Sequence, residues 1–404
     1  MKILYIAAGI PVPGALGGST HAYEVARGLA RRGHTLHLVA TGGRREGGLL
    51  GALARPVSST LDGFHLHHQD LPKALTLLGA APILRLARAI RPDAIMERYY
   101  NFAGVGMLAA RRLGIPALLE VNALIVDPPA VLKRRLDDGI GGPMRRWAEW
   151  QCRAADRIVT PLHTTVPPAI PREKIVELPW GADVERFAEV AAARLAQPPA
   201  RSPQNVVFMG SFRAWHGVRD FVRAALLLLE QGHNLRFTLI GDGPERAAAQ
   251  AQAAPRAERF TFTGAVPYEQ VPALLAQADL GVAPFNTAPH PALRAAGFFW
   301  SPLKIYEYMA AGLPVVTAAI PPLNTIIREG QEGALFPEGD LPALAAAIAR
   351  ALADPREALA MGARARERVV ANYSWQRHCA ELERILQSML EARGRPAGVA
   401  ARPG

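Results

Sequence analysis

Short apolar runs alternate along the chain with longer segments whose apolar residues recur at helical spacing. The runs 3–8 and 35–40 predict buried strands, and segment 20–32 between them predicts a helix with Tyr23 and Leu29 on one face. Continuous apolar strands separated by helices are typical of a parallel sheet covered on both faces. Further strands of this first half are predicted at 94–96, 117–121, 157–160 and 175–178.

The same alternation restarts after residue 203, and the segment 191–203 between the halves is rich in Ala, Pro and Ser, as linkers are. We therefore predict an α/β fold with two domains; a single large α/β domain is the alternative. Strands are predicted at 206–210, 235–240, 260–263, 280–283, 314–317 and 334–336, and helices at 218–231, 341–354, 356–371 and 375–393. The predicted boundaries are a first domain at 1–190, a linker at 191–203, a second domain at 204–374, a terminal helix at 375–392 and a disordered tail at 393–404.

Composition narrows the classes of protein. Half of the 404 residues are hydrophobic and 20% are charged, which excludes a disordered chain. The net charge of +11 favours an anionic partner without choosing among lipid, nucleic acid and phosphorylated substrates, and no nucleic-acid motif accompanies it. Two Cys residues are too few for a disulfide framework or a four-Cys zinc site. The apolar N-terminal run is too short for a signal peptide, and no apolar stretch reaches the ~18 residues of a membrane span, so we expect a cytoplasmic protein.

The segment 301–316 carries the strongest candidate chemistry. Ser301 is a good N-cap, and the free N–H groups of a helix starting near Leu303 would suit a phosphate. Lys304 adds a charge in the first turn, and Glu307 lies about one turn further along the same side. A cation near a diphosphate and a carboxylate near a ribose would suit a nucleoside diphosphate. The alternative is an ordinary capped helix with a surface Lys–Glu pair.

This segment resembles the donor-site helix of GT-B glycosyltransferases, in particular the retaining enzymes of family 4. Other stretches agree with that family in the right order, and together they cover nearly the whole chain: Gly17-Gly18-Ser19 and the segments 178–187, 210–217, 240–245, 262–264, 278–280 and 373–375. The resemblance implies two facing Rossmann-like domains with a cleft between them. The first would bind the acceptor, the second the nucleotide-sugar donor, and the terminal helix would cross back to the first.

The resemblance also implies an activity: transfer of a hexose-type sugar from a nucleotide diphosphate sugar to a hydroxyl of a glycan, lipid-linked or small-molecule acceptor, with retention, in polysaccharide or glycolipid biosynthesis. No cofactor and no metal are implied, and no catalytic residue is assigned. Phe299 stands where the family often has the first Glu of a Glu-x7-Glu pair, and Ser211 and His216 stand where it has Arg and Lys. The expected donor-binding residues are Gly210, Arg213, His216, Leu303, Lys304 and Glu307.

Polar residues and glycines near the ends of the first domain's strands suggest an acceptor cleft. Glycines let a ligand approach the backbone closely, and alternation puts Glu120 and Asn122 on one side of a strand. The alternatives are a flexible glycine loop, strand-end capping, and for His21 a partly exposed helix histidine. The expected acceptor or cleft residues are Gly17, Gly18, His21, Arg98, Tyr99, Glu120 and Asn122.

The segment 128–153 combines Lys133-Arg134-Arg135 and Arg145-Arg146 with Trp147 and Trp150. Basic residues with Trp favour an anionic membrane surface, so peripheral contact with the inner membrane surface is one expectation. A solvated helix face with packed Trp residues is the other.

Two other functions stay open. A nucleotide-sugar epimerase of the same architecture would need acid/base groups in the cleft, for which Glu97, Glu120 and His21 are candidates. A non-catalytic nucleotide-binding protein is the second, because Phe299 and Ser211 depart from the family pattern.

Overall fold

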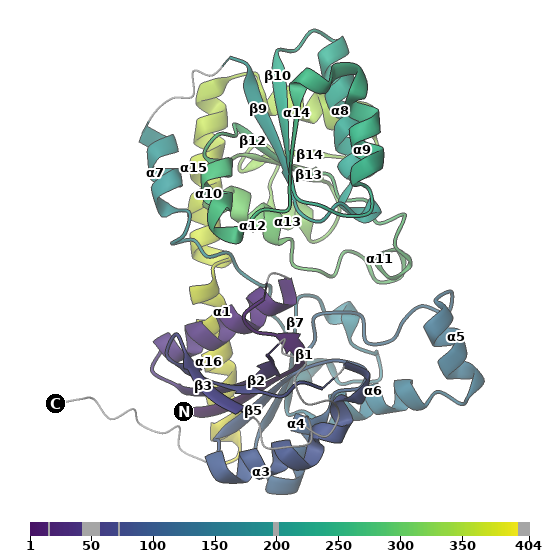
Figure 1. Cartoon of the computed structure of the whole chain (residues 1–404), viewed down its shortest axis with the longest axis vertical. Coiled ribbons are helices and arrows are strands. Elements are labelled where there is room, and N and C mark those ends of the chain that lie inside the picture. Colours follow the sequence, from purple (N-terminus) through teal and green to yellow (C-terminus); the bar gives the residue numbers. More distant parts are fainter. Residues whose placement is uncertain (15–16, 43–56, 72, 197–201, 395–404) are drawn as a thin grey trace, which may run out of the picture. The chain divides into compact units, whose positions relative to one another are not determined.

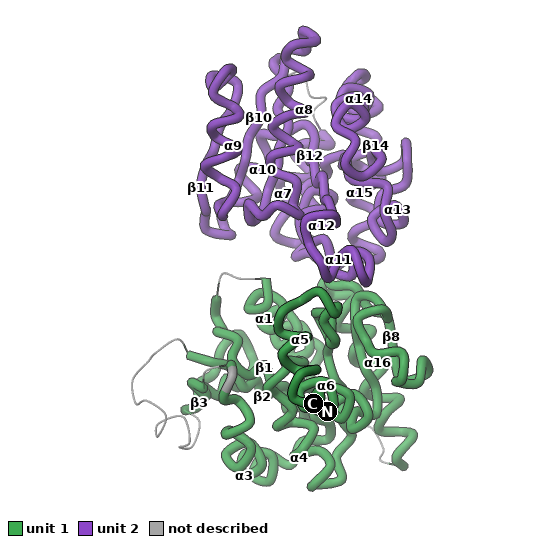
Figure 2. Tube along the Cα trace, turned by 90° about the vertical axis from the view of Figure 1, so that its right-hand side faces the viewer, with its two compact units in different colours: residues 1–180, 375–404 green, residues 181–374 purple. Residues whose placement is uncertain are grey.

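The computed structural model describes residues 1–14, 17–42, 57–71, 73–196 and 202–394, and the chain divides into two compact units (Figures 1 and 2). Unit 1 comprises Met1–Trp180 and Trp375–Gly404, and unit 2 comprises Gly181–Ser374. Residues 197–201 of the expected linker and 395–404 of the expected tail lie outside the described residues. The expected linker begins at residue 191, but helix α7 (Ala188–Ala196) continues through that point, and Arg194 Nη2 donates to the Leu275 carbonyl at 2.9 Å. α7 is therefore part of unit 2, and the division falls earlier, after Trp180.

Within the described part of unit 1, eight strands form one sheet in the order β3-β4-β2-β1-β5-β6-β7-β8. Neighbouring strands are parallel except β3 and β4, which are antiparallel. β3 was not predicted, because polar residues such as Ser58 interrupt its apolar pattern. The sequence favours a loop or an edge strand for the segment with His65, His67 and His68, and the structure has a strand there, β4, which lies inside the sheet between β3 and β2. The strands are β1 (Lys2–Pro11), β2 (Thr35–Thr41), β3 (Val57–Leu61), β4 (Phe64–His68), β5 (Ala94–Arg98), β6 (Ala117–Glu120), β7 (Arg157–Thr160) and β8 (Ile175–Glu177).

Helices cover both faces of this sheet. α3, α4 and α6 share one apolar core with β1, β5 and β6. α1 and the C-terminal helix α16 pack closely together, since a Cβ at Gly28 would lie 2.4 Å from Cys379 Sγ (Figure 1). The helices of unit 1 are α1 (Gly17–Arg31), α3 (Ala80–Ile90), α4 (Val105–Leu113), α5 (Leu132–Gly139), α6 (Pro143–Ala154) and α16 (Trp375–Ala392).

The described part of unit 2 holds a second sheet, of six parallel strands in the order β11-β10-β9-β12-β13-β14. Helices α8, α9 and α14 share a core with one face, and on the other Tyr308 of α12 accepts a hydrogen bond from Met209 N at 2.6 Å. The strands are β9 (Gln204–Met209), β10 (Leu235–Ile240), β11 (Phe260–Gly264), β12 (Leu280–Ala283), β13 (Val315–Ala318) and β14 (Gly333–Phe336). The remaining helices are α8 (Val218–Glu230), α9 (Arg246–Ala253), α10 (Val271–Leu275), α11 (Pro291–Ala296), α12 (Leu303–Ala310), α13 (Leu323–Ile326), α14 (Leu341–Leu352) and α15 (Pro355–Asn372).

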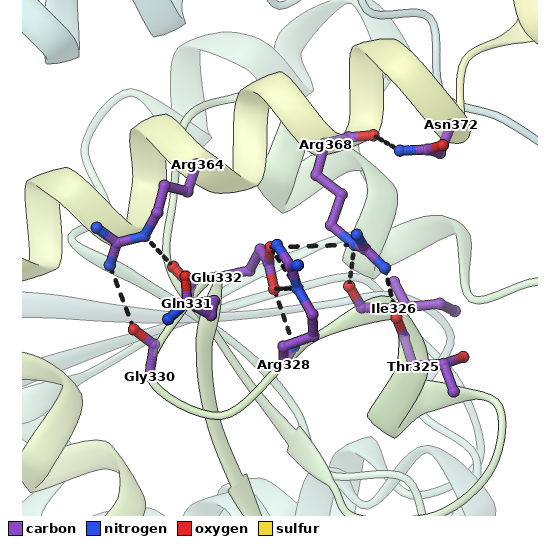
Figure 3. A network of polar contacts seen from close by, with 9 residues as sticks. All are labelled: Thr325, Ile326, Arg328, Gly330, Gln331, Glu332, Arg364, Arg368 and Asn372. Atoms are coloured by element: carbon purple, nitrogen blue, oxygen red, sulfur yellow. Dashed lines mark hydrogen bonds and ion pairs between the residues drawn. The ribbon is translucent and has the colours of Figure 1, made fainter.

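Arginines of α15 bond to the end of α13 and to the loop before β14 (Figure 3). Arg368 donates to the carbonyls of Ile326 and Thr325 at 3.0 and 2.7 Å, and Arg364 donates to the Gln331 carbonyl at 2.7 Å. The buried carboxylate of Glu332 accepts from the backbone N and the side chain of Arg328. These contacts fix the last strand of the sheet against the helix.

Among the described residues, no helix combines the length and the apolarity needed to cross a bilayer.

Candidate functional site

The strand order of unit 2 reverses between β9 and β12, and ligands of open α/β sheets collect at such a reversal. Gly210 directly follows β9, Phe285 follows β12 closely, and α12 begins nearby at Leu303. The expected N-cap at Ser301 is wrong: the N-cap position is Pro302, without a side-chain hydrogen bond. Leu303 N donates to the Ser301 carbonyl at 3.0 Å, because the chain turns tightly before the helix, so this N–H is not free for a ligand.

The ammonium group of Lys304 is buried among apolar side chains, and we call this set of side chains the Lys304 pocket. Lys304 Nζ lies 4.2 Å from the ring centroid of Phe208 and 4.9 Å from that of Phe285. The residue is 7% exposed, and in the described structure Nζ has no hydrogen-bond partner. Burial lowers the pKa of Lys304 to about 7, although Glu307 opposes this shift. The full charge expected from the sequence is therefore only partly present at pH 7.

Gly210 and His216 lie against this ammonium group. A Cβ at position 210, where φ is +133°, would lie 3.1 Å from Lys304 Nζ and 3.4 Å from His216 Nδ1. Burial and, next, the charge of Lys304 lower the pKa of His216 to about 2, so its ring is neutral. Its Nδ1 lies 3.3 Å from Ser211 Oγ. Arg213 is exposed at the start of the same turn.

Glu307 is positioned by two residues that the sequence analysis missed. Tyr268 donates its hydroxyl to Glu307 Oε1 at 2.8 Å, and the Arg186 guanidinium lies 4.8 Å from the Tyr268 ring centroid. Desolvation raises the pKa of Glu307 to about 7, against the opposing effects of Tyr268, Lys304 and Arg186. No sequence spacing relates positions 186 and 268 to 307, so only the fold could show these contacts.

Aromatic residues border the Lys304 pocket. The Trp215 ring lies 3.8 Å from the His216 ring and 4.4 Å from the Trp300 ring, centroid to centroid. Both Trp side chains are partly exposed, whereas Phe299 is 2% exposed. The position that the family often fills with a Glu is therefore a buried core position in this chain.

In unit 1, the Glu120 carboxylate at the end of β6 is surrounded by donors. Tyr5 donates to Oε2 at 2.5 Å, and Asn122 Nδ2 donates to Oε1. His21 Nε2 and Arg98 Nη1 lie 3.0 and 3.5 Å from Oε1. The structure thus brings four predicted residues together, namely His21, Arg98, Glu120 and Asn122.

The protonation of His21 follows from its neighbours. Arg98 Nη1 lies 3.0 Å from His21 Nδ1, and a guanidinium only donates, so the ring proton is on Nε2, facing Glu120. Burial and, next, the Arg98 charge hold the pKa of His21 well below its usual value. The reading of His21 as a partly exposed helix residue is wrong, because Trp180, Trp375 and His378 surround its fully buried ring.

Of the other predicted residues of unit 1, Gly17, Gly18 and Asn122 lie in or beside the Glu120 cluster, and Tyr99 does not. Gly17 and Gly18 open α1, and a Cβ at Gly18 would lie 3.6 Å from Arg98 Nη2. Asn122 Oδ1 accepts from Trp180 Nε1 at 2.7 Å. Tyr99 is not part of this cluster: it is 8% exposed, burial raises its pKa, and its hydroxyl donates to Asn101 at 2.8 Å.

Glu97 has a structural partner. Its two carboxylate oxygens accept from the backbone N of Gly104 and of Met107, both at 2.8 Å, at the start of α4. Burial nevertheless raises the pKa of Glu97 to about 6. Glu97 thus caps a helix and Glu120 is surrounded by donors, so two of the three acid/base candidates for an epimerase are held in structural contacts.

Comparisons with known proteins cover both units. Residues 16–186 match the family described as Glycosyltransferase Family 4, and residues 203–354 match the one described as Glycosyl transferases group 1. A GDP-mannose-dependent alpha-(1-6)-phosphatidylinositol monomannoside mannosyltransferase of Mycolicibacterium smegmatis is 30% identical over 230 residues, which are 55% of this chain and 59% of that protein. The D-inositol 3-phosphate glycosyltransferase of Nocardia farcinica is 29% identical over 357 residues, 83% of this chain and 76% of that protein.

Solved structures show the same fold. Sucrose-phosphate synthase from Thermosynechococcus elongatus superposes with a TM-score of 0.71 at 19% identity, over 97% of this chain and 99% of that one. Anabaena HepE in complex with UDP superposes with a TM-score of 0.68 at 19% identity, over 96% of this chain and 100% of that one.

Proposed function

The chain belongs to the family 4, group 1 glycosyltransferases and has their GT-B fold, and on that premise we propose that it transfers a hexose from a nucleotide diphosphate sugar to an acceptor hydroxyl with retention. Unit 2 binds the donor and unit 1 the acceptor.

One observation carries the donor site: the buried ammonium of Lys304 has no hydrogen-bond partner among the described residues and lies where the strand order of unit 2 reverses. An unpaired buried cation is unfavourable, and an anionic ligand would remove that cost. Because burial lowers the pKa of Lys304 to about 7, its ammonium group is only partly charged at pH 7, and a bound anion favours the fully charged form.

The neighbouring residues match the rest of a nucleoside diphosphate. Neutral His216 and exposed Arg213 give a hydrogen bond and a second charge to the diphosphate, and Gly210 places no side chain against Lys304. Glu307, oriented by Tyr268, accepts from the ribose hydroxyls. These groups stabilise the charge that develops on the leaving diphosphate as the glycosidic bond breaks.

We infer that the aromatic side chains next to Lys304 contact the sugar of the donor. Trp215 and Trp300 are partly exposed and adjoin the Lys304 pocket through His216, so a sugar attached to the bound diphosphate lies within their reach. Their faces offer apolar contact where the family often has a carboxylate, because Phe299 is buried.

The test is transfer from a panel of nucleotide sugars to simple acceptors, with Glu307→Ala and the matched control Glu269→Ala, an exposed carboxylate near Tyr268. We expect Glu307→Ala to lose about 10²–10³-fold in kcat/KM and Glu269→Ala to keep wild-type turnover. Wild-type turnover by Glu307→Ala would contradict the donor site. Tight nucleotide binding without turnover on any donor would instead favour a non-catalytic nucleotide-binding protein.

A further inference from the structure

α5 of unit 1 exposes apolar side chains in a row, which we call the α5 stripe: Leu132, Leu136 and Ile140. They are 68%, 63% and 73% exposed, although large apolar residues are ordinarily covered. Leu132 and Leu136 are one turn apart on α5, and Ile140 follows directly after the helix. Contiguous exposed apolar residues mark a surface that another body covers.

The opposite face of α5 is fixed, so the stripe cannot turn inward. The Asp137 carboxylate is 5% exposed and accepts from the backbone N of Met144 and Arg145 at 2.8 and 3.1 Å, which caps α6. Arg134 Nε donates to Asp138 Oδ2 at 2.7 Å on the same side. The hydrogen bonds of Asp137 therefore hold α5 in the orientation that exposes the stripe.

Basic side chains flank the stripe on both sides. At about 100° per residue, Lys133 lies on one side of the Leu132–Leu136 row and Arg135 on the other, and both are exposed. Lys133 Nζ lies 3.2 Å from Asp127 Oδ2 in a surface ion pair, so Arg135 is the flanking cation without an acidic partner among the described residues. Asp138, the exposed acid of α5, lies on the far side between Arg134 and Arg145. Apolar residues edged by long basic side chains complement a surface that is apolar inside and anionic at its rim.

The Trp residues of this region do not share the stripe. Trp147 and Trp150 stack on each other with ring centroids 4.6 Å apart, and Trp147 Nε1 donates to the Ala103 carbonyl at 2.8 Å. The side chains available for insertion are thus the aliphatic ones of the α5 stripe.

We propose that the α5 stripe docks unit 1 on a bilayer surface containing anionic phospholipid. Leu132, Leu136 and Ile140 enter the boundary between head groups and acyl chains, while Lys133 and Arg135 contact lipid phosphates. The proposal does not depend on sugar transfer, and its tests read binding alone.

The first test is flotation of the full chain with vesicles of phosphatidylcholine, with and without about one third phosphatidylglycerol. We expect binding to the anionic vesicles only. Leu132→Ser/Leu136→Ser/Ile140→Ser should weaken it by about tenfold per residue, and Lys133→Gln/Arg135→Gln by about fivefold per charge. Since all five positions are exposed, the variants should keep the wild-type melting temperature.

The matched control is Val57→Ser/Leu78→Ser/Val370→Ser, whose residues are 71%, 47% and 44% exposed on other elements. It should bind like the wild type. Equal loss in both triple variants would overturn the assignment to α5. A wild-type chain that does not bind anionic vesicles would also overturn the proposal. If that chain forms dimers that the stripe substitutions dissociate, the stripe binds a second copy; if it stays monomeric, the stripe serves a protein partner.

A second readout locates the contact. Both native cysteines, Cys152 and Cys379, are buried, so Leu136→Cys and Val370→Cys can each be labelled with an environment-sensitive dye. Anionic vesicles should shift the emission of the dye at position 136 to the blue and leave the dye at position 370 unchanged. The reverse pattern would contradict the proposal.

Discussion

The two polar centres of the molecule are built in opposite ways. In unit 1 the Glu120 carboxylate receives hydrogen bonds from Tyr5 and Asn122 and has His21 and Arg98 within 3.5 Å. In unit 2 the Lys304 ammonium lies between two Phe rings with no hydrogen-bond partner among the described residues. A saturated buried centre fixes the geometry of the strands that carry it, whereas an unsaturated one is destabilising until a ligand completes it. Between these two centres, the proposed donor site of unit 2 is the one whose buried charge lacks a hydrogen-bond partner among the described residues.

The largest expected effect comes from removing the unsaturated cation. Lys304→Met should lower kcat/KM by about 10²–10³-fold, because the leaving diphosphate loses a charge partner. The same substitution should raise the stability of the free protein by about 2–4 kcal/mol, because Lys304 no longer has to give up its proton or its hydration on folding. Steady-state kinetics measures the loss of kcat/KM, and urea unfolding measures the gain in stability.

Lys174→Met is the control for that variant, because Lys174 Nζ donates to the carbonyls of Arg153 and Ala155 at 3.0 and 2.9 Å. It should lower stability and leave turnover unchanged. If both Met variants shift stability in the same direction, the contrast between a partnered and an unpartnered lysine fails.

Replacing each of the two carboxylates by an amide should change protein stability differently in the two centres. Glu120→Gln should cost about 2–3 kcal/mol of unfolding free energy, since an amide cannot accept from every donor that surrounds Glu120. Glu307→Gln should instead raise the unfolding free energy by about 2–3 kcal/mol, because burial raises the pKa of Glu307 to about 7 and a neutral amide avoids the cost of burying the carboxylate at pH 7. Denaturant unfolding at pH 7 measures both, and equal costs would be evidence against the distinction.

The affinity for nucleoside diphosphates should peak near pH 7. Above it, free Lys304 loses the proton that an anion requires, and below it free Glu307 gains the proton that blocks acceptance from ribose hydroxyls. Each limb should fall by up to about tenfold per pH unit. Calorimetric titrations should show that Lys304→Met lacks the alkaline limb and Glu307→Gln the acid limb; two unchanged limbs would contradict the assignment.

The smallest expected effect comes from adding a methyl group at Gly210, next to Lys304. Gly210 and Gly232 both have positive φ, but a Cβ at Gly232 meets no atom within 4 Å. Gly210→Ala should therefore destabilise by about 1 kcal/mol more than Gly232→Ala and also weaken nucleotide binding. Equal effects on melting temperature and affinity would show that position 210 is not crowded.

The sequence was most informative where a residue's neighbours are close along the chain. The strands 235–240 and 280–283 coincide with β10 and β12, because apolar runs bounded by Gly or Asp report a buried strand directly. Lys304 and Glu307 share one helix, so their proximity could be predicted. The proximity of Glu120 and Asn122 could be predicted in the same way, because they lie two residues apart at the end of one strand.

What the sequence could not give depends on the packing of distant segments. Tyr268 contacts Glu307, and Trp180 and His378 contact the His21 ring, across separations that no periodicity encodes. The burial of His21 follows from those neighbours, and the lowered pKa of Lys304 follows from burial beside Phe208 and Phe285, which are also distant in the sequence. The exposure of Leu132 and Leu136 was missed for the same reason, because the anchor at Asp137 that turns them outward involves a different helix.

The titration of Lys304 itself tests the central claim most directly. The chain has five lysines, so NMR of protein labelled with ¹³C at lysine Cε gives few signals, and Lys304→Met assigns one of them. We expect this signal to titrate at about pH 7 in the free protein and at higher pH when UDP or GDP is bound. A Lys304 signal that titrates near the ordinary lysine value of about 10, or that no nucleoside diphosphate moves, would contradict this expectation.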